Sequence, residues 1–99
     1  MLQTTQHLAL QVKMIADRLF PDRTDASLYL KLYEETAEVI ASNGNPDEVA
    51  DIFILWMDYA VRKGIDIEAA VQHKLAILQE RGWQIDSNGV YQHTENSNG

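Results

Sequence analysis

The sequence predicts an all-α protein, a four-helix up-and-down bundle. Four segments place apolar residues at helical spacing rather than in alternation. Short breakers rich in Gly, Pro, Asn and Asp separate the segments, as expected for antiparallel neighbours. The chain has 99 residues and no cysteine, so it is the size of one domain and its fold uses neither disulfides nor thiolate metal sites.

The first two helices have clear faces and ends. The apolar residues of the first follow i, i+4 and i+7 spacing before Pro21, and they are Leu8, Val12, Ile15 and Leu19. The second is expected over residues 26–42, with Thr24 or Asp25 as its N-cap and Gly44 as its stop.

The third and fourth helices follow after similar signals. Asn45 is suited to cap the third helix and Pro46 to occupy its first position, and the pattern continues to about Lys63. The fourth begins after Asp66 and is expected to reach about Arg81.

The C-terminal stretch "WQIDSNGVYQH" sets an Asn-Gly turn between two short β-prone runs, which predicts a small hairpin. We therefore expect a helical domain over residues 1–83 and a hairpin with a tail over residues 84–99. The last residues, "TENSNG", have the composition of a disordered end.

The charge balance excludes several classes of partner. Eight Lys and Arg against 15 Asp and Glu give a net charge of -7, without a basic run, so nucleic acid is not an expected partner. No apolar run approaches the roughly 18–20 residues of a membrane span, and the polar start "MLQTTQ" does not resemble a signal peptide. The protein is expected to be cytoplasmic, away from membranes.

Acidic residues gather on one face of each central helix. On the second helix the polar residues within an arc of roughly 100° are Lys31, Glu34, Glu35 and Glu38. On the third, a similar arc interrupted only by Leu55 contains Asp47, Glu48, Asp51, Asp58 and Arg62. Nearly all other positions of both helices are apolar or small.

Two interpretations of these arcs stand side by side. They are either the solvated faces of amphipathic helices or two halves of an oxygen cage for Mg²⁺ or Mn²⁺. Like charges at i, i+4, as in Glu34 and Glu38, favour a cation that relieves the repulsion. Glu48 also stands where it could close a capping box, but Asp51 one turn away favours metal binding.

The two acidic motifs carry a resemblance. "EETAE" (Glu34 to Glu38) followed by "EVAD" (Glu48 to Asp51) resembles the EExxE and ExxD motifs of the MazG-like, all-α nucleoside triphosphate pyrophosphohydrolases. The likeness extends over about residues 25–83 and includes "KLYEE", "KGID" and "RGW". The tail is similar to the branch of that family found in phages and mobile elements.

The resemblance implies a Mg²⁺-dependent hydrolase, with Mn²⁺ as the alternative ion. Such an enzyme cleaves a (d)NTP between the α and β phosphates to give the monophosphate and pyrophosphate, in the manner of a nucleotide-pool cleaning enzyme. The positions that match the metal ligands of the family are Glu35, Glu38, Glu48 and Asp51. On chemical grounds Glu34 or Glu38 accepts the proton of the attacking water.

Substrate-binding residues are assigned more loosely. Lys74 and Arg81 share a face of the fourth helix and either hold the β and γ phosphates or solvate that helix. Lys31 is either a phosphate ligand or the partner of Glu35, and Asp58 either supports the metal site or lies near the sugar.

The base-binding residues are the least defined. No aromatic residue occurs early in the first helix, which leaves His7 and Gln11 as candidates. Relatives often have Asn four residues after the basic residue of the fourth helix, where this chain has Leu78.

Wide apolar arcs on both acidic helices predict a homodimer or homotetramer, as in the family, with a pocket between subunits. The alternative function is a non-enzymatic, oligomeric helical regulatory module whose acidic strip binds a basic partner. The presence of a Glu or Asp at every metal position favours the enzyme.

Overall fold

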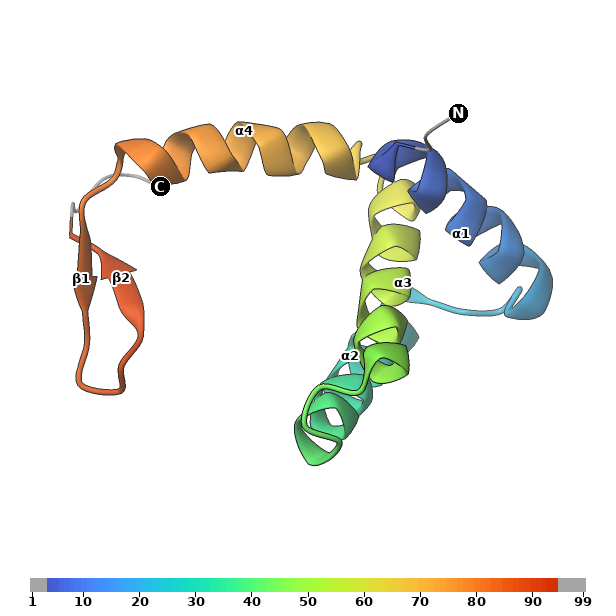
Figure 1. Ribbon diagram of the computed structural model, residues 1–99. Coiled ribbons are helices and arrows are strands. Elements are labelled where there is room, and N and C mark those ends of the chain that lie inside the picture. The colour runs from blue at the N-terminus through green and yellow to red at the C-terminus, as the bar shows by residue number, and fades with distance from the viewer. Residues whose placement is uncertain (1–3, 95–99) are drawn as a thin grey trace. The chain divides into compact units, whose positions relative to one another are not determined.

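The computed structural model describes residues 4–94. Its elements are the helices α1 (Thr5–Leu19), α2 (Asp25–Ala41), α3 (Pro46–Arg62) and α4 (Ile67–Glu80) and the strands β1 (Trp83–Ile85) and β2 (Tyr91–His93) (Figure 1). The predicted all-α class, the four helices and the small hairpin are thus confirmed. The disorder predicted for the tail concerns mainly residues 95–99, which lie outside the described residues.

The chain forms two compact units, Met1–Glu68 and Ala69–Gly99. The first contains α1, α2 and α3 and the start of α4, and the second contains the rest of α4 and the hairpin. Each unit is described by itself, and the domain division expected after residue 83 stays a prediction.

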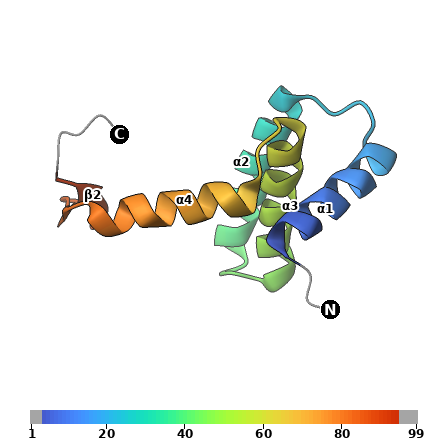
Figure 2. The same ribbon diagram turned by 90° about the horizontal axis from the view of Figure 1, so that it is seen from above.

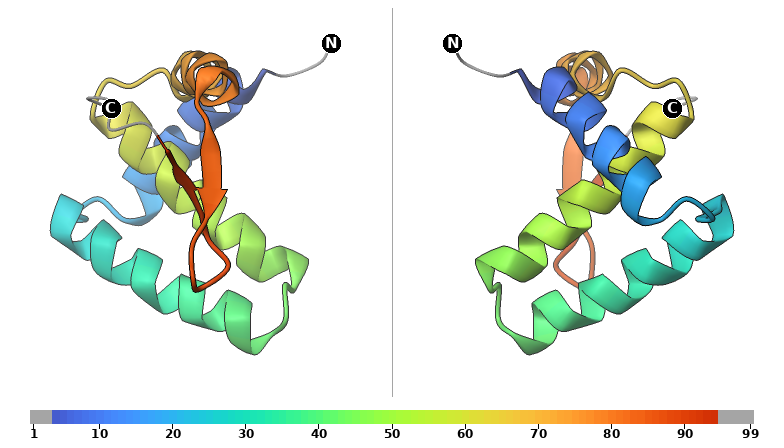
Figure 3. Two further views of the ribbon diagram at one scale, coloured as in Figure 1. Left: turned by 90° about the vertical axis from the view of Figure 1, so that its left-hand side faces the viewer. Right: turned by 90° about the vertical axis from the view of Figure 1, so that its right-hand side faces the viewer.

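In the first unit α3 lies between α1 and α2. The second and third helices run antiparallel side by side, and α1 crosses α3 obliquely (Figures 2 and 3). Within residues 4–94 the buried apolar side chains are Ala9, Ala16, Leu28, Leu32 and Ala60. This core consists of small and aliphatic residues, because none of the large aromatic side chains of α2 and α3 is buried.

The second helix begins with a reciprocal cap. The Ser27 backbone N–H donates to Thr24 Oγ1 at 3.1 Å, and the Thr24 N–H donates to Ser27 Oγ at 2.9 Å. This capping box satisfies two backbone N–H groups that a helix start leaves without partners. Of the two residues considered as the cap, Thr24 is the one used.

The turn between α2 and α3 reverses the chain within a few residues. Asn43 (φ 56°) and Gly44 (φ 86°) both adopt the left-handed conformation, which Gly and Asn tolerate best. The side chain of Asn45 then accepts the N–H of Asp47 at 2.9 Å, so Asn45 caps α3 as predicted. The turn brings the acidic ends of the two helices next to each other.

In the second unit the strands pair antiparallel, with Trp83 opposite His93 and Ile85 opposite Tyr91. The indole N–H of Trp83 donates to the carbonyl of Leu78 at 3.0 Å, which ties the hairpin to the last turn of α4.

Across residues 4–94 none of the helices combines the length and the apolar character needed to cross a membrane.

Candidate active site

Five carboxylates of α2 and α3 gather near the turn that joins these helices, and we call them the acidic cluster: Glu34, Glu35, Glu38, Glu48 and Asp51. Two sets of three can each place one oxygen per residue within 4.8 Å of the others. One set consists of Glu34, Glu35 and Glu38, and the other of Glu35, Glu48 and Asp51. Glu35 belongs to both sets, so it is the carboxylate that joins the two helices.

Glu35 is also the buried member of the acidic cluster. Its side chain is 8% exposed, and its Oε1 lies 3.2 Å from the ammonium of Lys31. Its Oε2 is buried without a hydrogen-bond partner. A buried carboxylate oxygen without a partner costs free energy, so this oxygen is suited to an additional cation.

Lys31 is the basic residue that pairs with the acidic cluster. Its ammonium lies 3.2 Å from an oxygen of Glu34 and 3.2 Å from one of Glu35. The hydrogen bonds that Lys31 donates to Glu34 and then to Glu35 raise the pKa of Lys31 above its usual value. Of the two roles considered for Lys31, pairing with Glu35 is thus present in the structure.

Glu48 is not needed to cap α3. In a capping box its side chain would accept the backbone N–H of Asn45, but that N–H donates to Ser42 Oγ at 3.2 Å. Ser42, at the end of α2, therefore replaces Glu48 in this role. The Glu48 carboxylate is left for the acidic cluster, next to Glu35 and Asp51.

A second charged group contains Asp58, farther along α3, and we call it the Arg23 cluster: Asp17 of α1, Arg23 of the loop between α1 and α2, and Asp58. The guanidinium of Arg23 donates to both oxygens of Asp58, at 2.6 and 2.7 Å, and to Asp17 at 2.7 Å. The Arg23 and Asp58 side chains are 7% and 3% exposed. The hydrogen bond to Asp58 raises the pKa of Arg23 further above its usual value, so the guanidinium stays charged.

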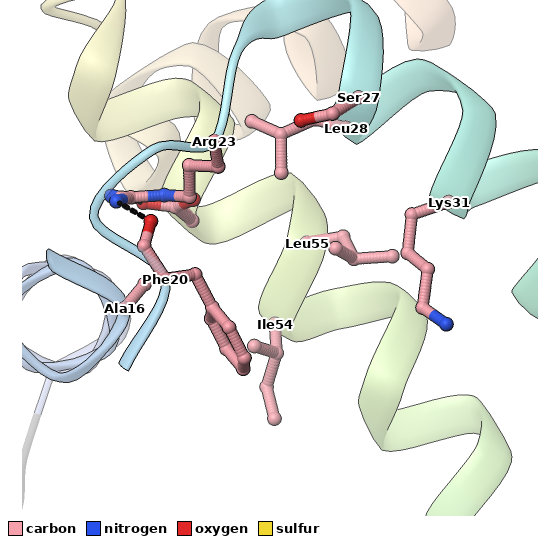
Figure 4. Close-up of a pocket in the computed structure, with 9 residues that line it drawn as sticks. Ala16, Phe20, Arg23, Ser27, Leu28, Lys31, Ile54 and Leu55 are labelled. Carbon is pink, nitrogen blue, oxygen red and sulfur yellow. Dashed lines mark hydrogen bonds and ion pairs between the residues drawn. The ribbon is translucent and has the colours of Figure 1, made fainter. Parts of the chain in front are cut away.

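A cavity of about 290 Å³ lies along α2 and α3, beside the end of α1. Figure 4 shows its lining, with Arg23 and Lys31 on opposite sides of Leu55. The lining residues are Ala16, Phe20, Arg23, Ser27, Leu28, Lys31, Ile54, Leu55 and Asp58. The wall is almost wholly apolar because Arg23 and Asp58 use their polar atoms on each other.

The acidic cluster, the cavity and the Arg23 cluster follow one another along the two helices. On α3 the order is Asp51, Leu55 and Asp58, and on α2 it is Glu35, Lys31 and Leu28. Seven residues of helix rise about 10 Å, which separates Asp51 from Asp58. The polar stripe predicted on α3 is thus interrupted at Leu55 because Leu55 lines the cavity.

The other predicted substrate-binding residues lie away from this cavity or in the second unit. His7 and Gln11 are exposed on α1, and the rise of the helix puts His7 about 20 Å before Phe20. Lys74 is exposed on α4 and Arg81 follows that helix directly, both in the second unit. The assignments of all four stay predictions, as does a direct role of Asp58 at the sugar.

Sequence reasoning missed Arg23 and Phe20. Both belong to the loop between α1 and α2, which was treated only as a breaker. A single Arg in a loop belongs to no periodic pattern or motif that would mark it as functional. The available signal was Asp58, a carboxylate on an apolar helix, which needs a cation if it is buried.

Comparison with known proteins identifies the family. No family model matches the chain. A dATP/dGTP diphosphohydrolase of Cyanophage S-2L is 38% identical over 96 residues, which cover 95% of this chain and 91% of that protein. A structure of the Cyanophage S-2L MazG-like pyrophosphohydrolase, bound to dGDP and three catalytic Mn²⁺ ions per active site, matches 95% of this chain and 100% of that chain with a TM-score of 0.84 and 37% identity. The chain belongs to the MazG-like pyrophosphohydrolase family.

A second relative is a dATP/dGTP diphosphohydrolase of Salmonella phage PMBT28, 48% identical over 79 residues. The chain spans only 27% of the length of that protein, and the matched part covers 79% of this chain. The resemblance to the phage branch of the MazG-like family, inferred from the acidic motifs and the tail, is therefore confirmed.

Proposed function

We propose that this MazG-like protein is a divalent-metal-dependent pyrophosphohydrolase that converts a (d)NTP to the (d)NMP and pyrophosphate. The observation that carries the proposal is Glu35, a buried carboxylate shared by two three-acid sets, with one oxygen that has no partner. The names of the phage relatives, dATP/dGTP diphosphohydrolases, favour purine deoxynucleotides as substrates. A role in cleaning the nucleotide pool is consistent with that chemistry.

The acidic cluster fits hard divalent cations. All of its donors are carboxylate oxygens, the ligands that Mg²⁺ and Mn²⁺ prefer. Glu35, Glu38, Glu48 and Asp51 would hold the metal, with Glu35 shared between positions. The partnerless oxygen of Glu35 supports this assignment, as does the Mn²⁺ bound by the cyanophage relative.

The chain's own residues then divide the work of hydrolysis. Bound Mg²⁺ or Mn²⁺ would neutralise the polyphosphate, polarise the α phosphorus and lower the pKa of water. Glu34, an exposed carboxylate with 59% of its side chain accessible, accepts the proton of the attacking water, and Glu38 is the alternative base. The water oxygen bonds to the α phosphorus as the bond from that phosphorus to the αβ-bridging oxygen breaks.

The cavity is suited to the nucleoside. It begins at Lys31, beside the acidic cluster, and extends along Leu55 toward Phe20, so phosphates at the cluster would place the base against apolar side chains. Its wall offers shape and burial rather than hydrogen bonds, which fits relatives named for both dATP and dGTP. The assignment of Lys74 and Arg81 to the β and γ phosphates stays a prediction from the sequence.

The protein would act as a homodimer or homotetramer. Large apolar side chains of α2 and α3 are unusually exposed, among them Tyr33 (76%), Ile40 (75%) and Phe53 (59%). Exposed apolar surfaces of this kind mark interfaces. A monomer mass in light scattering at micromolar protein would contradict this part of the proposal.

The test is incubation with a panel of NTPs and dNTPs in ¹⁸O-labelled water, with Mg²⁺ or Mn²⁺. We expect monophosphate and pyrophosphate, with ¹⁸O in the monophosphate because the attack is at the α phosphorus. Diphosphate and phosphate would contradict the assigned bond. The absence of turnover with every nucleotide and both ions would favour a non-enzymatic oligomeric module instead.

Glu38→Gln provides the matched variant. We expect it to lower kcat by about 1,000-fold or more, because a metal ligand and candidate base is lost. Its helical circular dichroism should be unchanged in metal-free buffer. Glu80→Gln, at an exposed position at the end of α4, controls for the loss of one negative charge and should retain full activity.

A further inference from the structure

Lys31 occupies a position that serves two parts of the site. Its ammonium is bound between Glu34 and Glu35, at 3.2 Å from each, while its side chain also lines the cavity. With 49% of its surface accessible, the side chain is free to take other rotamers. Lys31 is thus a movable cation at the junction of the acidic cluster and the cavity.

Without metal, this ammonium is the counterion that allows Glu35 to be buried. Glu35 has one oxygen near Lys31 and one without a partner, next to further carboxylates of the acidic cluster. An isolated charge in such a position is costly. In the metal-free protein Lys31 therefore neutralises part of the negative charge that a divalent cation would otherwise neutralise.

The ammonium and a divalent cation compete for the same carboxylate. Two cations on Glu35 repel each other strongly because a half-buried site screens them poorly. Glu34, the other partner of Lys31, belongs to the set that lies on α2 alone, so a cation there competes for it as well. The flexible lysine is the cation that can leave.

We propose that Lys31 is a positioning residue that exchanges partners: it neutralises Glu34 and Glu35 in the metal-free protein, and metal binding releases its ammonium to the phosphates of a nucleotide in the cavity. Metal loading thereby creates the positive group that the polyphosphate needs. This inference rests on the proposed function and adds an order of events, metal before nucleotide.

The test measures Mn²⁺ affinity by calorimetry without nucleotide, in low salt. We expect Lys31→Gln to bind Mn²⁺ about 3- to 10-fold more tightly than wild type, because a competing cation is gone. The gain should shrink at high salt. A dNTP analogue with a non-hydrolysable αβ bridge, added after metal, should bind more weakly to the variant than to wild type.

Lys63→Gln is the matched control. It removes the same charge from an exposed lysine that pairs with Asp25 and lies outside the acidic cluster. It should leave the Mn²⁺ affinity unchanged, and Lys31→Arg should restore behaviour close to wild type.

A second readout uses the wild-type protein and does not depend on a variant that folds. Addition of Mg²⁺ should move the ¹³Cε and ¹⁵Nζ resonances of Lys31 toward those of a solvated lysine. Resonances that stay in place when metal binds, or a Lys31→Gln variant with unchanged or weaker Mn²⁺ affinity, would overturn the proposal. Failure of wild type itself to bind Mn²⁺ would instead refute the proposed function.

Discussion

Within residues 4–94 the buried carboxylates are those of Glu35 and Asp58, on neighbouring helices, and their surroundings differ. Asp58 receives hydrogen bonds from Arg23 on both oxygens, whereas Glu35 has one oxygen near the half-exposed Lys31 and one without any partner. Both oxygens of Asp58 therefore have hydrogen-bond partners within the protein itself. In the acidic cluster one oxygen of Glu35 lacks such a partner, and we infer that this difference separates a structural ion pair from a cation site.

The largest effect on stability is expected from a substitution in the Arg23 cluster. Asp58→Asn should lower the free energy of unfolding by about 3 kcal/mol, because it leaves the buried guanidinium of Arg23 without its main counterion. Urea denaturation at a fixed protein concentration measures this loss, since an oligomer's stability depends on concentration. A loss below about 1 kcal/mol would mean that the Arg23 cluster does not hold the loop between α1 and α2.

The next largest effect is the stabilisation expected when Mg²⁺ binds the acidic cluster. Mg²⁺ at about 100 times its Kd should stabilise wild type by about 2.7 kcal/mol, because the ion binds the folded cluster and not the unfolded chain. Thermal unfolding with Mg²⁺ and then with excess chelator measures the shift. Asp58→Asn, if folded, should show the same shift in melting temperature, because Asp58 belongs to the Arg23 cluster and the acidic cluster is left intact. Equal melting temperatures with and without Mg²⁺ would contradict the account.

Glu35→Gln should behave in the opposite way to Asp58→Asn. In metal-free buffer we expect its free energy of unfolding to stay within about 1 kcal/mol of wild type, since the substitution also removes repulsion within the acidic cluster. Urea denaturation in the presence of chelator provides the measurement. A loss as large as that of Asp58→Asn would show that Glu35 is a structural residue.

The smallest expected effect is on the pH dependence of stability, and it comes from Asp17 in the Arg23 cluster. Hydrogen bonds from Lys13 and then Arg23 hold the pKa of Asp17 below its usual value of 3.8. A lowered folded-state pKa contributes stability above pH 3.8 that is lost as the pH falls through the folded value. The stability of Asp17→Asn should therefore fall less than that of wild type below about pH 4, as followed by circular dichroism, and parallel curves would contradict this pair.

The sequence was sufficient for the helices and for the acidic cluster, for physical reasons. Helical periodicity and the caps at Thr24 and Asn45 are local signals, and the spacing of Glu35 with Asp51 across a short turn constrains where they meet. The burial of Asp58 was harder to predict, because its partner, Arg23, comes from a loop 35 residues away in sequence. Ser42 accepts the Asn45 N–H in place of Glu48, and no sequence motif predicts this contact.

Mn²⁺ binding tests the central claim, that the acidic cluster is built for a cation, most directly. Calorimetric titration of wild type, Glu35→Gln and the control Glu80→Gln compares the shared carboxylate with an exposed one. The account predicts that Glu35→Gln weakens Mn²⁺ binding at least about 100-fold, while Glu80→Gln binds as wild type does. Equal affinities of wild type and Glu35→Gln would contradict it.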